Sequence, residues 1–216
     1  MTANLETIVE RIRADLERKN AIRDATLARS RTLIRMCANT IRAVHRHEFD
    51  EARDALAEAG AFAQVMDDEA RTYPDLYYAG YLQDALKEFA EAAITLAVVT
   101  GEPLPEPEAL GVGYAAYLNG LGEAMGEMRR FALDAMRRGN NAEAERLLET
   151  MDEVYSYLIA IDFPDALTMN LRRTTDMVRG VVERTRGDLT VAVGQEKLQA
   201  SLQDFERRWD ARVGTS

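Results

Sequence analysis

Helical periodicity with few chain breakers is the feature that most constrains the fold of this chain. Apolar residues recur at three-to-four spacing along the first segment, for example at Ile8, Ile12 and Leu16, and this spacing is typical of an amphipathic helix. The 216 residues include only five prolines and thirteen glycines. No stretch shows the strict apolar–polar alternation of a half-buried strand. The sequence therefore predicts an all-α protein.

The few breakers divide the chain into helices. Pro74 suits the first turn of a helix, Gly139 suits a C-terminal cap, and Asn140 or Asn141 suits the start of the next helix. Asn20 is a candidate break within the first helix. Short connections favour antiparallel packing of consecutive helices in a bundle. We expect helices over 5–46, 51–67, 74–99, 107–110, 114–138, 141–160 and 164–193, followed by an amphipathic segment over 198–209.

Composition limits the cellular setting. The single cysteine, Cys37, excludes an internal disulfide and favours a reducing compartment; it lies on an apolar stripe and is expected in the core. The longest apolar stretch, over 92–99, is far too short to span a bilayer. The first residues lack the basic-then-apolar pattern of a secretory signal. We expect a soluble cytoplasmic protein that does not interact with membranes.

The charge is distributed unevenly. The formal net charge is −10, which argues against broad non-specific binding of nucleic acid. Residues 1–48 contain ten Lys or Arg and six Asp or Glu, whereas residues 49–127 contain three and sixteen. The acidic charge is therefore concentrated in the middle of the chain.

Two acidic pairs in this middle segment are the candidate site. Glu88 and Glu91 are three residues apart, and Glu123 and Glu127 are four apart; both spacings place two carboxylates on one face of a helix. The surrounding residues are mostly apolar or small, and an unpaired carboxylate is costly to bury. Two such helices facing each other would form an all-oxygen pocket, which hard divalent cations prefer. Such a pocket could support metal-assisted phosphodiester hydrolysis.

Both pairs also have plainer explanations. The first pair could belong to a solvated acidic face, with Lys87 as the nearby basic partner in its helix. In the second helix, Glu127 could pair with Arg130 at a close helix–helix contact. Each glycine there lowers helix propensity by roughly 1 kcal/mol relative to alanine, so close approach of another helix or of a ligand would account for Gly120, Gly122 and Gly126.

The remaining polar residues exclude some chemistries and leave one possibility open. Neither of the two histidines, His45 and His47, follows a glutamate in the Glu-x-x-His pattern of di-iron bundles. The sequence also contains no Gly-rich phosphate loop, cysteine cluster or Ser-His-Asp candidate. One stripe of arginines at near-helical spacing could bind phosphates or form ion pairs with the acidic middle segment. It consists of Arg31, Arg35, Arg42 and Arg46.

Several blocks of the sequence resemble the translin/TRAX family. They are residues 117–130, residues 151–155 with the Arg172-Arg173 and Asp176 region that follows, and residues 73–91. Their order and spacing carry the resemblance, which extends over about residues 23–193. It implies a seven-helix translin-like bundle of long antiparallel helices, forming one domain over residues 1–216. Family members assemble as closed octameric shells with the active sites inside.

The resemblance also implies an activity. TRAX-type subunits are metal-dependent endoribonucleases, whereas translin-type subunits bind RNA or single-stranded DNA without the catalytic acids. Glu88 and Glu91 match the TRAX Glu-x-x-Glu, Glu123 stands where Asp is common, and Glu127 matches the last acid. Translins carry a basic stretch just before the first acidic pair, whereas residues 79–85 of this chain are not basic. The residues that bind nucleic acid are therefore unassigned.

These observations together predict a TRAX-like enzyme. We expect Mg²⁺- or Mn²⁺-dependent endonucleolytic cleavage of short RNA, with Glu88, Glu91, Glu123 and Glu127 as metal ligands and catalytic residues. A non-catalytic protein that binds RNA or single-stranded DNA, and a helical scaffold, are the alternatives. We also expect a homo-oligomer, specifically an octamer, because long amphipathic helices leave apolar surface exposed. One such stripe near the end of the chain consists of Leu198, Leu202, Phe205 and Trp209.

Overall fold

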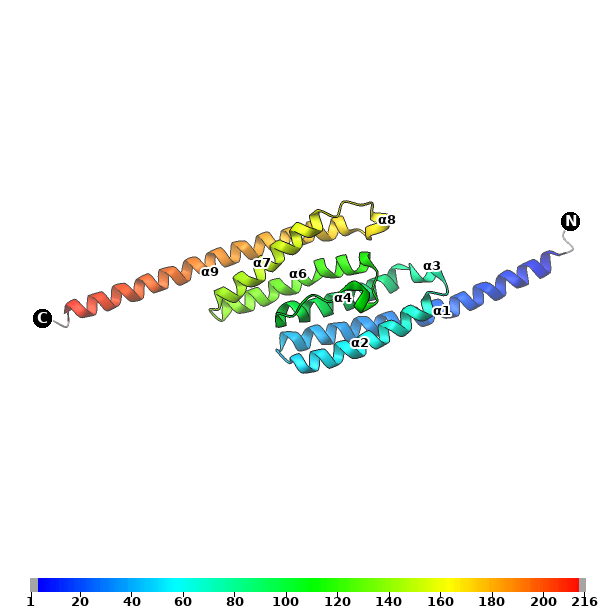
Figure 1. Ribbon diagram of the computed structural model, residues 1–216, viewed down its shortest axis with the longest axis horizontal. Coiled ribbons are helices and arrows are strands. Elements are labelled where there is room, and N and C mark those ends of the chain that lie inside the picture. The colour runs from blue at the N-terminus through cyan, green and yellow to red at the C-terminus, as the bar shows by residue number, and fades with distance from the viewer. Residues whose placement is uncertain (1–3, 214–216) are drawn as a thin grey trace. The chain divides into compact units, whose positions relative to one another are not determined.

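The computed structural model describes residues 4–213, and every regular element in that range is a helix (Figure 1). The all-α prediction is therefore confirmed. Six helices are long: α1 (Leu5–His45), α2 (Phe49–Ala70), α4 (Gly80–Thr100), α6 (Tyr114–Arg137), α7 (Asn141–Ile159) and α9 (Leu171–Val213). Three have four residues each: α3 (Pro74–Tyr77), α5 (Pro107–Leu110) and α8 (Asp165–Thr168).

One long helix lacks the candidate break, and another is longer than expected. The candidate break at Asn20 is absent, because α1 continues through it and the Asn20 side chain donates a hydrogen bond to Asp24 one turn later. The segments expected over 164–193 and 198–209 are both largely contained in α9, which begins at Leu171. No proline interrupts either helix, so the backbone hydrogen bonds can run on without a gap.

The helix expected over 74–99 is instead two helices. The helix α3 ends at Tyr77, and Ala79 has an extended backbone (φ −67°, ψ 137°) before α4 begins at Gly80. The side-chain amide of Gln83 donates a hydrogen bond of 2.8 Å to the Tyr77 carbonyl. This bond satisfies a carbonyl that the end of a helix leaves without an intrahelical partner.

The chain divides into two compact units. Unit 1 contains residues up to Ala124 together with Phe163–Leu171, and unit 2 contains Met125–Asp162 together with residues from Arg172 onward. The helix α6 begins in unit 1 and ends in unit 2. The single domain expected over residues 1–216 stays a prediction.

Unit 1 is built around α4. This helix packs against α1 and α2, which also pack against each other (Figure 1). Its residues 89–98 are all buried, and most of them are apolar. The helix therefore contributes a nearly continuous apolar surface to the core. Alanines on the buried face of α2 allow close helix packing; they are Ala52, Ala59, Ala63 and Ala70.

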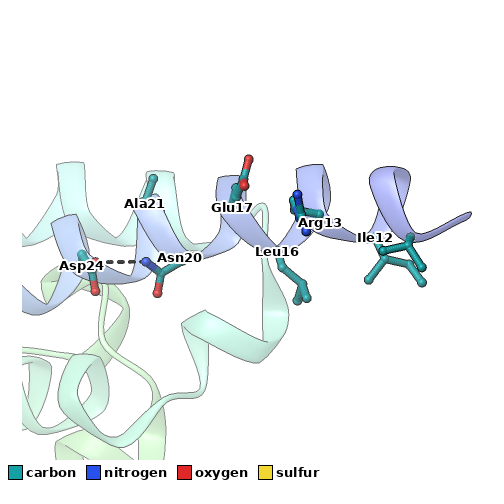
Figure 2. A pocket seen from close by; sticks show the side chains of 8 residues that line it. Ile12, Arg13, Leu16, Glu17, Asn20, Ala21 and Asp24 are labelled. Carbon is teal, nitrogen blue, oxygen red and sulfur yellow. Dashed lines mark hydrogen bonds between the residues drawn. The ribbon is translucent and has the colours of Figure 1, made fainter. Parts of the chain in front are cut away.

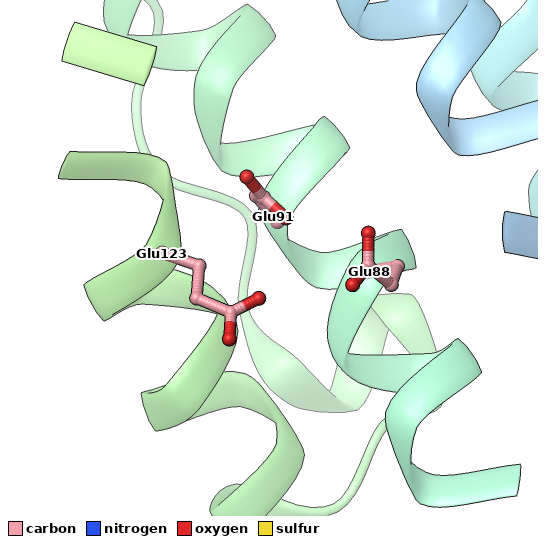
Figure 3. Close-up of side chains that lie close together, drawn as sticks. All are labelled: Glu88, Glu91 and Glu123. Atoms are coloured by element: carbon pink, nitrogen blue, oxygen red, sulfur yellow. The ribbon is translucent and has the colours of Figure 1, made fainter. Parts of the chain in front are cut away.

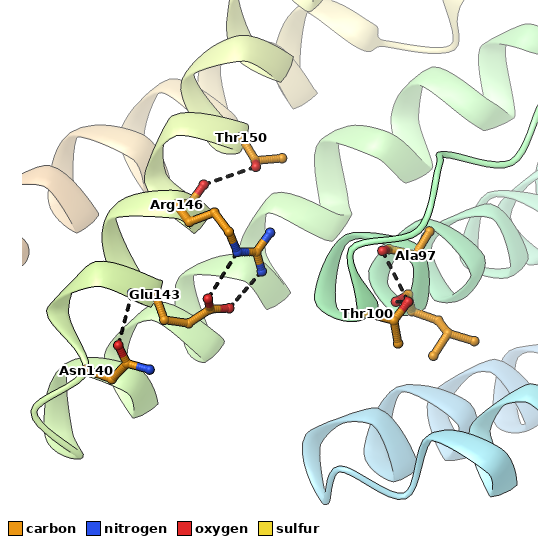
Figure 4. Close-up of polar contacts among 7 residues, drawn as sticks. Ala97, Thr100, Asn140, Glu143, Arg146 and Thr150 are labelled. Atoms are coloured by element: carbon orange, nitrogen blue, oxygen red, sulfur yellow. Dashed lines mark hydrogen bonds and ion pairs between the residues drawn. The ribbon is translucent and has the colours of Figure 1, made fainter.

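Unit 2 contains the second half of α6, together with α7 and nearly all of α9. Its buried side chains include Met128, Leu147 and Val182. Gly139 has the positive φ (74°) expected of the cap after α6, and the Asn140 side chain accepts a hydrogen bond from the Glu143 amide at the start of α7 (Figure 4). Both caps agree with the sequence analysis.

Two apolar stripes near the ends of the described chain are exposed. On α1 the stripe consists of Leu5, Val9, Ile12 and Leu16. It borders a shallow groove along that helix, and Figure 2 shows the Ile12 and Leu16 side chains there. On α9 the predicted stripe is also exposed; it consists of Leu198, Leu202, Phe205 and Trp209. Across residues 4–213, no helix is long and apolar enough to cross a membrane.

Candidate metal centre

Three of the four predicted acids converge within unit 1. Glu88 and Glu91 lie one turn apart on α4, and Glu123 lies on the first half of α6 (Figure 3). Each carboxylate offers one oxygen, and these three oxygens all lie within 4.8 Å of one another. We call this group the three-carboxylate cluster. Glu91 is buried, with 8% of its surface exposed, whereas Glu88 and Glu123 are half-buried.

Gly120 lets α6 approach α4 closely at this point. A Cβ atom at position 120 would lie 2.6 Å from the Lys87 carbonyl oxygen, 2.9 Å from the Ala90 Cβ and 3.0 Å from the Glu91 backbone nitrogen. No side chain fits there without movement of the α4 backbone. Since Glu123 is one turn beyond Gly120, the close contact is what brings its carboxylate to the acids on α4. At Gly126, by contrast, a Cβ atom would meet no other part of the protein within 4 Å.

Asn119 fixes the start of α6 from the other direction. Its side chain is buried (4% exposed) and its amide nitrogen donates to the Ala115 carbonyl at 2.8 Å and to the Thr168 carbonyl, at the end of α8, at 2.9 Å. Sequence reasoning did not identify this residue. The available signal was an asparagine among small and apolar residues. If such a side chain is buried, its amide requires hydrogen-bond partners, so it can fix the position of its helix.

Lys87 places a positive charge in the cluster. Its ammonium nitrogen lies 2.7 Å from each carboxylate oxygen of Glu123 and 3.5 Å from Oε1 of Glu88. In the sequence, Lys87 stands out only as a neighbour of the first acidic pair. The structure shows that it joins an acid of α4 to an acid of α6.

Burial changes the proton affinities in and around the cluster. Desolvation raises the pKa of Glu88, Lys87 opposes this shift, and the negative charge of Glu123 adds to it. Desolvation acts to lower the pKa of Lys87, but the hydrogen bond to Glu123 and the negative charges of Glu123, Glu88 and Asp84 together exceed that effect, so the pKa is raised. The thiol of Cys37, on α1, has its pKa raised to about 12 by burial and then by the charges of Glu88 and Glu91. Cys37 is fully buried, as expected.

Glu127, the fourth predicted acid, is half-buried on α6 in unit 2. It lies one helical turn beyond Glu123. Its role as a ligand stays a prediction. The four arginines of the α1 stripe are all exposed. Arg46 contacts Glu48 and also Glu51, and only Glu51 belongs to the acidic middle segment of the pairing explanation. Arg35 and Arg42 donate hydrogen bonds to Thr32 and Asn39.

Charged side chains on α7 and α9 form several ion pairs. Arg186 pairs with Glu183 on the same helix and with Asp152 on α7. On α7 itself, Arg146 pairs with Glu143 through two contacts (Figure 4). Such exposed pairs contribute little stability each.

The donor set of the three-carboxylate cluster fits a hard divalent cation. Carboxylate oxygens are the preferred ligands of Mg²⁺ and Mn²⁺. Magnesium–oxygen distances of about 2.1 Å place opposite ligands about 4.2 Å apart, which is close to the 4.8 Å spread of the three oxygens. The residues present therefore suit such an ion, because the three oxygens would need to move only slightly closer together to bind it.

The fold and the site together define an all-helical protein with a carboxylate cluster between two adjacent helices. No protein-family model matches the chain. An uncharacterised protein of Methanocaldococcus jannaschii, MJ0175, is 33% identical over 189 residues, which cover 87% of this chain and 83% of that protein. The Archaeoglobus C3PO solved as a complex with duplex RNA is 33% identical, with a TM-score of 0.80 over 87% of this chain and 97% of that one.

Two further solved structures agree with this likeness. A crystal structure of the same Archaeoglobus C3PO matches with 32% identity and a TM-score of 0.79 over the same shares of the two chains. The apo form of NeC3PO has 22% identity and a TM-score of 0.77 over 89% of this chain and 98% of that one, which supports the fold alone. The chain belongs to the translin/TRAX family.

Proposed function

We propose that this protein is a metal-dependent endoribonuclease of the TRAX type that cleaves short RNA. The observation that carries the proposal is the convergence of Glu88, Glu91 and Glu123 from two helices, with an oxygen of each within 4.8 Å of the others. Similarity to a C3PO solved with duplex RNA supports RNA as the substrate class. The substrate therefore offers phosphodiester bonds to a site that suits Mg²⁺ or Mn²⁺.

The residues have distinct proposed roles. Glu88, Glu91 and Glu123 would hold the ion, and Glu127 is proposed as a fourth ligand from its one-turn spacing to Glu123. A bound divalent cation would polarise the scissile phosphate and activate the attacking water. Burial of Glu91 keeps that carboxylate away from bulk solvent, which strengthens its attraction for a cation.

A translin-type binding protein without catalytic activity is the second candidate. The contacts of Lys87 with Glu88 and Glu123 favour it, because they neutralise part of the cluster without a metal ion. Under this alternative the acids serve only to join α4 to α6. RNA or single-stranded DNA would then be bound but not cut.

The two candidates differ in a cleavage assay. The wild type should cut a short RNA in Mg²⁺ or Mn²⁺ and stop in EDTA. Glu123→Gln and Glu127→Ala should abolish cleavage while RNA affinity stays equal or rises slightly, since each removes negative charge near the phosphates. Glu145→Gln, at an exposed position on α7, is the matched control and should cleave normally. Undiminished cleavage by folded Glu123→Gln protein would reject the catalytic assignment.

RNA binding needs positive charge that the overall −10 does not provide. We propose the exposed Arg31 and Arg35 of α1 as phosphate contacts. Replacing both with glutamine should weaken RNA binding and reduce the slope of affinity against salt concentration. Filter binding at several salt concentrations measures both quantities. An unchanged slope would leave pairing with acidic residues as the explanation of this stripe.

We further propose that the protein is a homo-octamer, in which a basic lining inside an acidic exterior would receive RNA. Its support is the exposed apolar stripe on α1 and the one on α9, which an isolated chain would leave in water. Light scattering coupled to size exclusion should return about eight times the 24.2 kDa chain mass. A monomer mass at micromolar concentration would refute the assembly.

A further inference from the structure

Lys87 occupies the space in which the proposed metal would meet Glu123. Its ammonium lies 2.7 Å from both carboxylate oxygens of Glu123, so it engages the two oxygens together. The same nitrogen lies 3.5 Å from Glu88. An ion bound to Glu123 on that side, at a usual metal–oxygen distance of about 2.1 Å, would be in direct contact with the ammonium. Two cations repel each other at such a distance.

The ion pairs of Lys87 are partly buried, unlike most surface ion pairs. The Lys87 side chain retains 18% of its exposure, and its two acidic partners retain 29% and 31%. Partly buried charges are screened less by solvent and salt than exposed ones. The backbone of Lys87 is also held, because its carbonyl lies against Gly120 at the contact between α4 and α6. The flexible part is the four-carbon side chain, which can carry the ammonium away without moving either helix.

The charges of the cluster give Lys87 a clear role when no metal is bound. Three carboxylates within 4.8 Å of one another repel. The ammonium reduces that repulsion and bridges the acids of the two helices. A divalent cation would do the same with more charge, so the ion and the ammonium are alternatives at Glu123.

We infer that Lys87 is a built-in counter-ion that competes with the divalent cation for Glu123 and so sets the affinity of the site for metal. This inference rests on the proposed function for the identity of the site. The ammonium must leave Glu123 before the ion binds there, and the energy of its contacts is subtracted from metal binding. Lys87 is thus a residue that tunes metal occupancy and not a metal ligand.

The test is a calorimetric titration of the 216-residue protein with Mn²⁺ alone. Lys87→Met removes the ammonium and keeps much of the side-chain volume. It should bind Mn²⁺ about 10-fold more tightly than the wild type or better, and should melt at a lower temperature in EDTA because the carboxylates lose their counter-ion. Unchanged or weaker Mn²⁺ binding would overturn the inference, because a lysine that only supports the local structure would not oppose the metal.

Further variants keep the test decisive. Lys87→Gln, which is also neutral but polar, covers the case in which the Met variant folds poorly; it too should bind Mn²⁺ more tightly. Lys87→Arg retains the charge and should not. Lys19→Met is the matched control, since it removes the surface ion pair with Asp75 and should leave Mn²⁺ affinity unchanged. If the Lys19 variant also bound Mn²⁺ more tightly, the change in net charge alone would explain the effect of Lys87→Met. That result would overturn the inference.

Cleavage assays separate this inference from the proposed function. If the wild type never cuts RNA yet Lys87→Met tightens Mn²⁺ binding, the nuclease proposal fails and the counter-ion role stands. If the wild type cuts RNA and Lys87→Met does not bind Mn²⁺ more tightly, the counter-ion role alone fails. Absence of Mn²⁺ binding in the wild type and in both neutral variants would overturn both.

Discussion

Gly120→Ala tests whether the close contact between α4 and α6 builds the site. The added methyl group would meet the Lys87 carbonyl oxygen at 2.6 Å and the Ala90 Cβ at 2.9 Å. Separations under about 3 Å between such atoms require one partner to move. The Lys87 carbonyl oxygen is a backbone atom in the middle of α4. Rotation of a side chain cannot relieve this contact, so α6 and α4 must move apart.

The size of the effect follows from two opposing terms. Alanine in place of glycine in a helix interior stabilises by about 1 kcal/mol. Overpacking of a well-packed site typically costs about 1–3 kcal/mol, and the upper part of that range applies because backbone atoms are involved. We therefore expect a net loss of about 1–2 kcal/mol. For a chain of this size, that corresponds to a melting temperature lower by roughly 2–8 °C.

Gly126→Ala provides the control on the same helix. Nothing lies within 4 Å of a Cβ at that position, so only the propensity term of about 1 kcal/mol remains. That variant should melt roughly 2–4 °C above the wild type. Thermal unfolding followed by circular dichroism in EDTA measures both. Mn²⁺ titration should show weaker binding only in Gly120→Ala, because Glu123 then lies farther from Glu88 and Glu91.

Equal melting temperatures for the two alanine variants would refute this reasoning. So would a Gly120→Ala protein that is destabilised but binds Mn²⁺ as tightly as the wild type. The first result would mean that the helices relax at no cost. The second would mean that the position of Glu123 does not depend on this contact.

Three further predictions address other parts of the molecule. Because Cys37 is buried with a pKa of about 12, only about one thiol in ten thousand would be ionised at pH 8; a disulfide reagent should label it only after denaturation, and rapid labelling of the native protein would contradict its burial. Desolvation raises the pKa of Glu88 above 4.5, so the folded state binds that proton more tightly and the free energy of unfolding falls as pH rises through the raised pKa. In EDTA, Glu88→Gln should therefore gain stability relative to the wild type between pH 4 and pH 8, and a difference that is the same at both pH values would exclude this linkage. Leu202→Asp with Trp209→Asp, both on the exposed stripe of α9, should lower the mass found by light scattering, whereas an unchanged mass would remove that stripe from the assembly interface.

Local signals in the sequence predicted the helices and several of their ends. The three-to-four periodicity predicted that these regions are helical, and Gly139 and Asn140 marked a helix end and the next start that the structure confirms. The break at Tyr78 and Ala79 was missed, because Pro74 allowed a single helix and the capping of Tyr77 by Gln83 depends on side-chain geometry. The continuation of α9 was also missed, since a weak apolar pattern does not distinguish one long helix from two.

The sequence by itself determined which acids share a helical face, because three- and four-residue spacings are fixed by the geometry of a single helix. It also identified the small residues that would permit close contact. Only the tertiary structure decided that Glu123 meets Glu88 and Glu91, that Gly120 and not Gly126 is the point of contact, and that the Lys87 ammonium lies among these acids. The physical reason is that the register between two helices is set by packing of residues distant in the sequence, which no local pattern records.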